Sequence, residues 1–167
     1  MSDKAKGILR DYISYIVIII AVILVKIYVV TPIKVNGPSM NDTLKDKDIM
    51  LLDEISYRFS DIERFDIVVI KHNDEYIIKR IIGLPGETVA YKDNQLYING
   101  KKVKENFSHK QTEDFDEVVV EEGTYFVLGD NRVNSVDSRI IGLVTKENIK
   151  GKATFVIYPF DRFGRKS

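Results

Sequence analysis

The segment IVVIKHNDEYIIKRII, residues 67–82, contains two apolar runs, 67–70 and 76–82, on either side of polar turn residues. Ile, Val and Tyr dominate both runs, and β-branched and aromatic residues favour strands. Runs of this length that are bounded by turn-forming residues are typical of β-strands. The pattern therefore predicts two strands here.

The same pattern recurs along the chain beyond residue 31. We predict further strands at residues 49–52, 88–91, 96–98, 118–120, 124–128 and 153–158. Asn99-Gly100 is a strong signal for a two-residue hairpin turn between 96–98 and 102–103. Short helical turns are expected at 39–44 and 146–149, but no long amphipathic helix separates the strands. The sequence thus predicts a mainly β fold, an antiparallel β domain.

Composition narrows the possible chemistry. The chain has 167 residues, 44% of them hydrophobic and 30% charged, which suits one folded domain rather than a disordered segment. It contains no Cys, which excludes disulfides, thiol catalysis and thiolate metal sites. Its two His residues, His72 and His109, lie far apart without a ligand-like spacing. We therefore expect no metal, no other cofactor and no Ser-His dyad.

An apolar stretch near the N-terminus predicts a membrane anchor at residues 12–30. Between residues 12 and 25, Ser14 is the only clearly polar residue, and after Lys26 the sequence is apolar again through residue 30. A helix of this length would reach about 28 Å, close to the hydrocarbon thickness of a bilayer. A cleaved signal peptide is the alternative, but no small-x-small cleavage pair follows the stretch. We favour an uncleaved anchor.

Charge suggests an orientation and disfavours one class of partner. Basic residues in segment 1–11 favour a cytoplasmic N-terminus, which would leave residues 31–167 as an extracytoplasmic β domain. Residues 1–30 hold four of the 25 basic and two of the 25 acidic side chains. The remaining domain is slightly acidic, so nucleic-acid binding is disfavoured. Within it, residues 92–120 are expected to form a surface excursion, because 101–117 is polar and has few apolar anchors.

Ser39 and Lys79 are candidate catalytic residues. Ser39 follows Gly37-Pro38 in a predicted turn, where a hydroxyl would be accessible for attack, although such a turn is common in itself. Lys79 lies within an apolar strand, and burial there would lower its pKa enough for it to act as a base. The alternative is a surface lysine. Strand alternation does not decide whether Lys79 or Arg80 points inward.

The loop at residues 129–139 is dense in Gly, Asp, Asn, Ser and Arg and directly follows a predicted strand. In it, Ser135 could donate a hydrogen bond to the free amine of Lys79, while Asp137 and Arg139 could form an ion pair that fixes the loop. A solvated surface loop is the alternative. The co-occurrence of this loop with the Ser39 and Lys79 segments favours a covalent hydrolase.

Three segments together resemble the type I signal peptidases, membrane-anchored enzymes that remove signal peptides from exported preproteins. They are Gly37-Pro38-Ser39-Met40, the Lys79–Gly86 segment KRIIGLPG and the Gly129–Arg139 segment GDNRVNSVDSR. The resemblance implies that Ser39 is the nucleophile, Lys79 the general base and Ser135 the residue that orients it. It also implies that Asp137 and Arg139 brace the site and that Asp130, Asn131 and Ser138 support it.

The resemblance also implies a groove that binds a preprotein as an added strand, with small side chains at the first and third positions before the cut. The residues that match the pocket-lining segments of the family are Ile33, Val35, Met40, Leu44, Ile77 and Ile78. Signal-peptide-bearing preproteins and the lipid bilayer are the implied partners, at the outer face of the cell membrane. This chain departs from the family pattern at Gly37, where some family members have a Ser whose hydroxyl donates to the oxyanion.

Two other functions are compatible with parts of this pattern. A self-cleaving repressor-type Ser/Lys domain is expected to share the fold, but it would need a DNA-binding segment and no anchor. A non-catalytic signal-peptidase-like accessory protein for surface-fibre (pilus) assembly would be expected to lack the Ser or the Lys, and both are present here. Signal peptide cleavage is therefore the leading interpretation.

Overall fold

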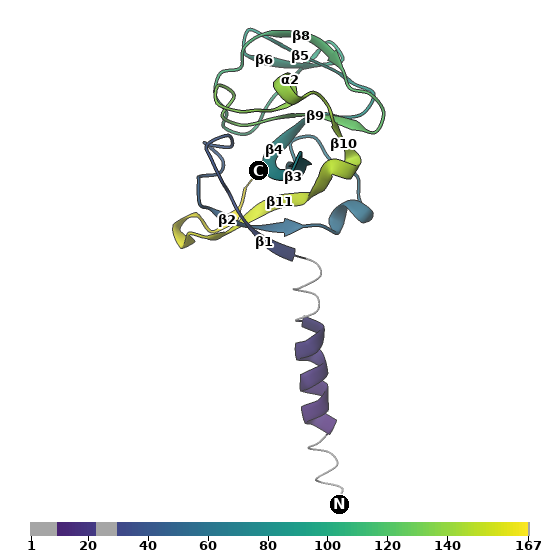
Figure 1. Ribbon diagram of the computed structural model, residues 1–167, viewed down its shortest axis with the longest axis vertical. Coiled ribbons are helices and arrows are strands. Elements are labelled where there is room, and N and C mark those ends of the chain that lie inside the picture. Colours follow the sequence, from purple (N-terminus) through teal and green to yellow (C-terminus); the bar gives the residue numbers. More distant parts are fainter. Residues whose placement is uncertain (1–9, 23–29, 167) are drawn as a thin grey trace, which may run out of the picture.

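The computed structural model describes residues 10–22 and 30–166 (Figure 1). Residues 10–22 form a helix whose large apolar side chains are exposed. Within the described ranges, no helix combines the length and the apolar character needed to cross a membrane. The predicted anchor at 12–30 includes residues 23–29, which lie outside the described residues, as does most of the predicted cytoplasmic segment 1–11.

The larger sheet has the order β1-β2-β11-β3-β4-β9-β10, and β12 pairs with β11. Its strands are β1 (Val30–Lys34), β2 (Ile49–Asp53), β3 (Ile67–His72), β4 (Glu75–Gly83), β9 (Thr124–Leu128), β10 (Val144–Thr145), β11 (Ile149–Tyr158) and β12 (Gly164–Arg165). Every pairing in it is antiparallel. The prediction of a mainly antiparallel β domain is confirmed.

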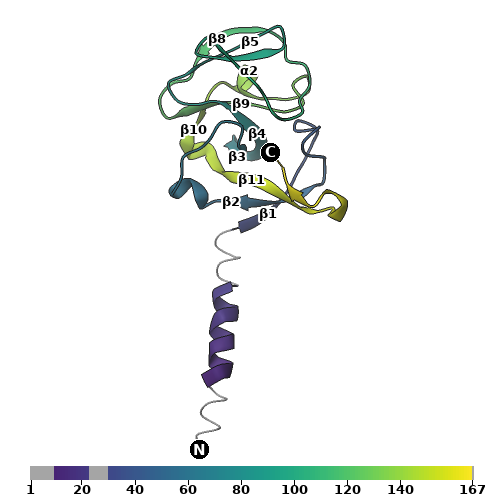
Figure 2. The same ribbon diagram turned by 180° about the vertical axis from the view of Figure 1, so that it is seen from behind.

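A smaller sheet lies at the end of the domain away from β1 and β2, as both views show (Figures 1 and 2). It has the order β7-β6-β5-β8, formed by β5 (Thr88–Lys92), β6 (Gln95–Ile98), β7 (Lys101–Val103) and β8 (Phe115–Val119). Short helical elements join the strands: η1 (Ser56–Arg58), α2 (Ser138–Ile141), η2 (Lys146–Asn148) and η3 (Phe160–Arg162). Asn99 and Gly100 both have positive φ, so the predicted hairpin turn between β6 and β7 is present.

The sequence located five strands of the larger sheet, β2, β3, β4, β9 and β11, but not β1 or the two-residue strands β10 and β12. β9 coincides with its prediction at 124–128, and β4 extends one residue beyond its prediction at each end. β1 contains Pro32, which argues against a central strand but is tolerated at a sheet edge, and β1 is the edge strand here. Residues 92–120 are better anchored than their composition indicated, because they bury Leu96 and Thr112.

Three apolar clusters form the core, and β4 contributes to each of them. Ile78 packs against the first, which includes Met40 and Leu44. Ile81 belongs to the cluster beneath β3 and β9, and Ile82 to the cluster that joins the small sheet to β9. Because β4 is covered on both faces, its second half is buried throughout. A polar side chain placed there must find a partner or lose its charge.

Candidate active site

Ser39 lies in a turn between β1 and β2 that is held by backbone hydrogen bonds. The N–H of Asn41 donates to the Pro38 carbonyl at 2.9 Å, and that of Leu44 donates to the Met40 carbonyl at 2.8 Å. The turn is entered through Gly37, whose φ of +85° suits glycine. Met40 and Leu44 are buried in the first apolar cluster. The turn is thus anchored on both sides of the Ser39 hydroxyl.

Lys79 lies on β4 and is only 3% exposed. Its Nζ is 2.8 Å from Ser39 Oγ and 3.0 Å from the Ile78 carbonyl oxygen. Burial lowers the pKa of Lys79 from 10.5 to about 8, although the carboxylates of Asp137 and Asp130 act in the opposite direction. About one tenth of the amine is therefore neutral at pH 7, against far less for an exposed lysine.

Arg80, the next residue of β4, is fully buried and points to the opposite face of the strand. Its guanidinium donates to both carboxylate oxygens of Asp130, at 2.8 and 2.7 Å, and to the Phe65 carbonyl at 2.9 Å. Strand alternation left open which of the two cations points inward. Both do, because β4 is covered on both faces.

The loop at residues 129–139 is tied to the Ser39 turn by main-chain contacts. The Asn131 N–H donates to the Ser39 carbonyl at 3.0 Å, and its side-chain amide donates to the Pro38 carbonyl at 3.1 Å. Thr43, on the same turn, donates its hydroxyl proton to Asp130. A Cβ at Gly129 would overlap the Ser39 carbonyl oxygen, so the close approach of the two segments needs a glycine.

The ion pair expected between Asp137 and Arg139 is present. Arg139 donates from Nε and Nη2 to the two carboxylate oxygens, each at 2.8 Å. Asp137 also accepts from the Gly129 N–H at 3.0 Å and caps α2 through the Arg139 N–H. Ser138 Oγ accepts from the Val127 N–H at 2.9 Å. The pair thus links residues within the loop, and the contact of Ser138 with Val127 joins the loop to β9.

Ser135 does not make the hydrogen bond that was predicted for it. Its Oγ is buried and has no hydrogen-bond partner among the described residues, and the Lys79 amine contacts the Ile78 carbonyl instead. The hydroxyl lies against Gly129, where a Cβ would overlap it. The orienting role of Ser135 is therefore not visible as a direct contact in the structure.

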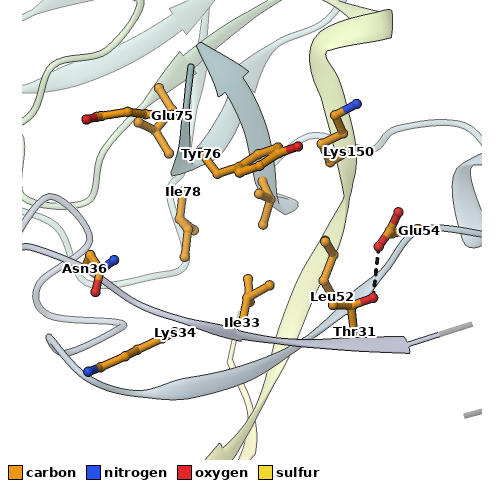
Figure 3. A pocket seen from close by; sticks show the side chains of 12 residues that line it. Thr31, Ile33, Lys34, Asn36, Leu52, Glu54, Glu75, Tyr76, Ile78 and Lys150 are labelled. Atoms are coloured by element: carbon orange, nitrogen blue, oxygen red, sulfur yellow. Dashed lines mark hydrogen bonds between the residues drawn. The ribbon is translucent and has the colours of Figure 1, made fainter. Parts of the chain in front are cut away.

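A cavity of about 790 Å³ lies between β1 and the first half of β4. Its lining residues are Thr31, Ile33, Lys34, Asn36, Leu52, Glu54, Val69, Glu75, Tyr76, Ile77, Ile78 and Lys150. Ile33 and Ile78 point toward one another across it (Figure 3). Ile33, Ile77 and Ile78 were predicted pocket residues, and the structure brings them together.

Three other predicted pocket residues, Val35, Met40 and Leu44, do not line this cavity. They are buried in the first apolar cluster, on which Ile33 and Ile78 pack. Several lining residues were not predicted from the sequence. Tyr76 could have been, since it is two residues from Ile78 and so shares its strand face. Nothing in the sequence pattern points to Leu52 or Val69. They lie on β2 and β3, which reach the cavity only once the sheet is assembled.

No group of three or more His, Cys, Asp or Glu side chains is placed to hold a metal ion within residues 10–22 and 30–166. A hydroxyl, a partly neutral amine and a braced loop lie near a cavity whose lining includes both apolar and charged side chains.

Comparison with known proteins decides the family. The family model described as signal peptidase, peptidase S26, matches residues 9–158. The chain belongs to this family. It is 40% identical over 173 residues to signal peptidase I S of Bacillus subtilis (strain 168), covering 95% of this chain and 94% of that protein. It is 37% identical over 179 residues to signal peptidase IB of Staphylococcus aureus (strain COL), covering 95% and 93%.

A solved structure supports the same assignment. The crystal structure of a signal peptidase I from Enterococcus faecalis V583 is 40% identical in sequence and matches with a TM-score of 0.50. The match covers 56% of this chain and 97% of that one. The chain is therefore a peptidase of the signal peptidase I type, and its substrates are preproteins that carry signal peptides.

Proposed function

We propose that the chain is a membrane-anchored serine endopeptidase that cleaves signal peptides after small-x-small sites, with Ser39 as nucleophile and Lys79 as general base. The observation that carries this proposal is the 2.8 Å separation between Lys79 Nζ and Ser39 Oγ inside a buried site. A general base must lie within hydrogen-bond reach of the proton that it removes. The lowered pKa of Lys79 supplies the neutral amine that this step requires.

The reaction would proceed through an acyl-enzyme. Lys79 takes the proton of Ser39 as Oγ attacks the carbonyl carbon of the scissile peptide bond. The resulting ammonium gives that proton to the departing amine, and the signal peptide stays bound to Ser39 as an ester. Lys79, neutral again, then takes a proton from an attacking water, and Oγ recovers a proton as the ester is cleaved.

The developing oxyanion needs hydrogen-bond donors that are already in place. The Ser39 N–H is one candidate, since it makes no hydrogen bond among the described residues. Gly37 offers no hydroxyl, and its own N–H donates to Asp46 at 2.9 Å. We therefore assign the Ser39 N–H as the principal oxyanion donor.

The cavity between β1 and β4 is the proposed binding groove. Within residues 10–22 and 30–166, β1 pairs only with β2, and residues 75–79 of β4 pair only with β3, so each strand has a free edge there. An extended peptide can add to such edges through main-chain hydrogen bonds. Ile33 and Ile78 narrow the groove from opposite walls (Figure 3). Bulky apolar walls would admit only small side chains, which gives small-x-small specificity a steric cause.

The membrane anchor remains a proposal that rests on the sequence. The described helix at 10–22 exposes apolar side chains along its length, which an aqueous environment would disfavour. We propose that the predicted anchor spans the bilayer from residue 12 up to the start of β1 at Val30, with 1–11 in the cytoplasm and the β domain outside. Residue-specific labelling of single Cys variants in intact cells would test this, and labelling of position 5 from outside would contradict it.

Cleavage of a preprotein by the purified full-length chain in detergent tests the proposed catalytic mechanism. We expect a single cut after a small-x-small site, identified by mass spectrometry of the products. Ser39→Ala and Lys79→Ala should each abolish it. Lys71→Ala and Ser60→Ala are matched controls, because both side chains are exposed and should leave activity unchanged. Retained cleavage by either site variant would contradict the roles assigned.

A further inference from the structure

Residues 104–114, here called the strap, join β7 to β8 but leave the small sheet to pack on the 129–139 loop. The Lys110 N–H donates to the Asp130 carbonyl oxygen at 2.9 Å. Thr112 is buried, and its own N–H is held by the Asn94 side chain at 2.8 Å. The strap is therefore fixed at one side to the small sheet and at the other to the loop that carries Asp130.

A buried ion pair joins the strap to the same loop. Arg132 is 2% exposed, and its Nη2 lies 2.5 Å from Glu105 Oε1. Its Nη1 donates to Thr112 Oγ1 at 2.6 Å and to the Tyr91 hydroxyl at 2.5 Å. Tyr91 in turn donates to Glu105, and His109 lies 3.2 Å from the same carboxylate. Three residues outside the loop thus bond one loop arginine directly, and His109 is linked to it through Glu105.

The carboxyl group of Glu105, which bonds Arg132, is ionised. Burial alone would raise the pKa of Glu105, but the hydrogen bond from His109 and the charge of Arg132 outweigh it and lower that pKa to about 2. Glu105 is therefore a carboxylate throughout the physiological range. A paired buried carboxylate resists removal of its partner, because the remaining charge would be stranded.

The strap also covers the second buried arginine of the site. The Phe107 ring lies over the Arg80 guanidinium, with Arg80 Cζ 3.8 Å from the ring centroid. Phe107 packs on Phe65 as well, with ring centroids 5.3 Å apart. The face of the Arg80–Asp130 pair is thereby closed by an aromatic ring, which favours the cation through its π-electrons.

Short contacts lead from these two arginines to the catalytic pair. Arg132 Nε donates to the Gly129 carbonyl at 3.0 Å, and the Asn131 N–H between them donates to the Ser39 carbonyl. Arg80 directly follows Lys79 on β4. A shift of the strap would therefore reach both the backbone that holds Ser39 and the strand that holds Lys79.

We propose that the strap positions the catalytic pair, with Glu105 and Phe107 as positioning residues that act through Arg132 and Arg80. This inference rests on the proposed Ser39 and Lys79 roles. A small displacement of a reacting group costs up to about 100-fold in rate even when binding is preserved. The cavity that would hold the substrate contains no strap residue. Loss of the strap contacts should therefore lower kcat while KM stays nearly constant.

Glu105→Gln and Phe107→Leu in the full-length enzyme test the proposal, with Glu113→Gln as the matched control because Glu113 is an exposed carboxylate on the same strap. We expect kcat per folded molecule to fall about 10-fold to 100-fold in both variants, with KM within about threefold of the wild type. The control should be unchanged. Folded fractions come from circular dichroism and correct each rate.

A pH profile separates positioning from mere stability. If the loop loosens and water reaches Lys79, its amine should titrate closer to the solvent value, so the midpoint of kcat against pH should move upward in Glu105→Gln. An unchanged midpoint together with wild-type kcat would overturn the proposal. Ser39→Ala in the same assay keeps the two hypotheses apart: if Ser39→Ala is inactive and the strap variants are fully active, only the strap proposal fails.

Discussion

Lys79 and Arg80 are adjacent cations on one strand, both buried, yet they have opposite environments. Arg80 makes a two-pronged ion pair with Asp130 and a further bond to a carbonyl oxygen. Lys79 has a hydroxyl and a carbonyl oxygen as its hydrogen-bond partners and no carboxylate within salt-bridge distance in the described structure. One face of β4 thus pairs its cation with a carboxylate, and the other face surrounds its cation with neutral hydrogen-bond partners.

The difference shows how one strand can carry both a structural and a catalytic cation. A guanidinium keeps its charge in proteins and presents a planar fork to a carboxylate, so its burial requires a partner such as Asp130. An amine can instead lose its proton, and burial without a close carboxylate favours that loss. The arginine face holds the loop in place, and the lysine face supplies the base.

Replacing the lysine by an arginine, so that both faces of β4 carry a permanent cation, should have the largest effect on activity. In Lys79→Arg the side chain stays cationic and cannot accept the Ser39 proton. We expect kcat to fall by about 10²-fold to 10⁴-fold, the range that a general base contributes. Preprotein cleavage by full-length enzyme measures it, with the exposed Lys71→Arg as control. Activity within tenfold of the wild type would mean that Lys79 is not the base.

Removing the charge from the arginine face should instead damage the fold. Arg80→Met leaves Asp130 buried without its partner, and breaking a buried pair costs about 3–5 kcal/mol. We expect the free energy of unfolding, from urea titration of the folded enzyme, to drop by that amount. The double variant Arg80→Met/Asp130→Leu should recover most of the loss. Equal instability of the single and double variants would show that the stranded carboxylate is not the cause.

Replacing Lys79 by Met, on the other face of β4, should instead increase the free energy of unfolding. At pH 7 the folded state must hold an amine whose pKa is about 8, against 10.5 for the exposed side chain. That shift corresponds to a penalty of about 3 kcal/mol. Lys79→Met removes the penalty but leaves the Ser39 hydroxyl without its partner, which costs about 1 kcal/mol. We therefore expect a net gain of about 2 kcal/mol in the free energy of unfolding at pH 7.

The gain should depend on pH in a definite direction. Between pH 8 and 10.5 the unfolded chain binds the lysine proton and the folded enzyme does not, so wild-type stability rises with pH in this window. The advantage of Lys79→Met should shrink accordingly and be lost by about pH 10. Lys71→Met, on an exposed side chain, should show no comparable trend. A gain that is constant from pH 7 to 10 would mean that the penalty is not one of protonation.

The contrast between the two cations was only partly visible in the sequence. The apolar run around Lys79 indicated that its amine could be buried, with a surface lysine as the alternative. The 129–139 loop suggested an ion pair between Asp137 and Arg139, which the structure contains. Alternation places neighbouring side chains on opposite faces but does not say that both faces are covered. That depends on which strands pack above and below β4, a non-local property.

The supporting contacts were harder to foresee for the same reason. Glu105 and Phe107 lie in a polar segment that looks like a solvated excursion, and their partners Arg132 and Arg80 are more than 25 residues away in sequence. The groove shows a similar limit. Ile33 and Ile78 followed from the family resemblance, whereas Leu52 and Val69 reach the cavity only once the sheet is assembled. Pattern reasoning finds strands and motifs, but not the pairs that long loops bring together.

The pH dependence of the reaction gives the smallest and most direct measure of the lysine face. Because the base must be neutral, kcat/KM should fall about tenfold per pH unit below the pKa of Lys79 in the free enzyme, which burial lowers to about 8. We expect half of the plateau rate near pH 8, about one tenth of it at pH 7, and no further rise above pH 9. Rates at preprotein concentrations well below KM, between pH 6 and 10, give kcat/KM and test this, with circular dichroism to verify that the enzyme stays folded. A flat profile across that range would mean that proton removal by Lys79 does not limit the reaction. A midpoint near 10 would mean that the amine is hydrated, and that the two faces of β4 differ less than their hydrogen bonds imply.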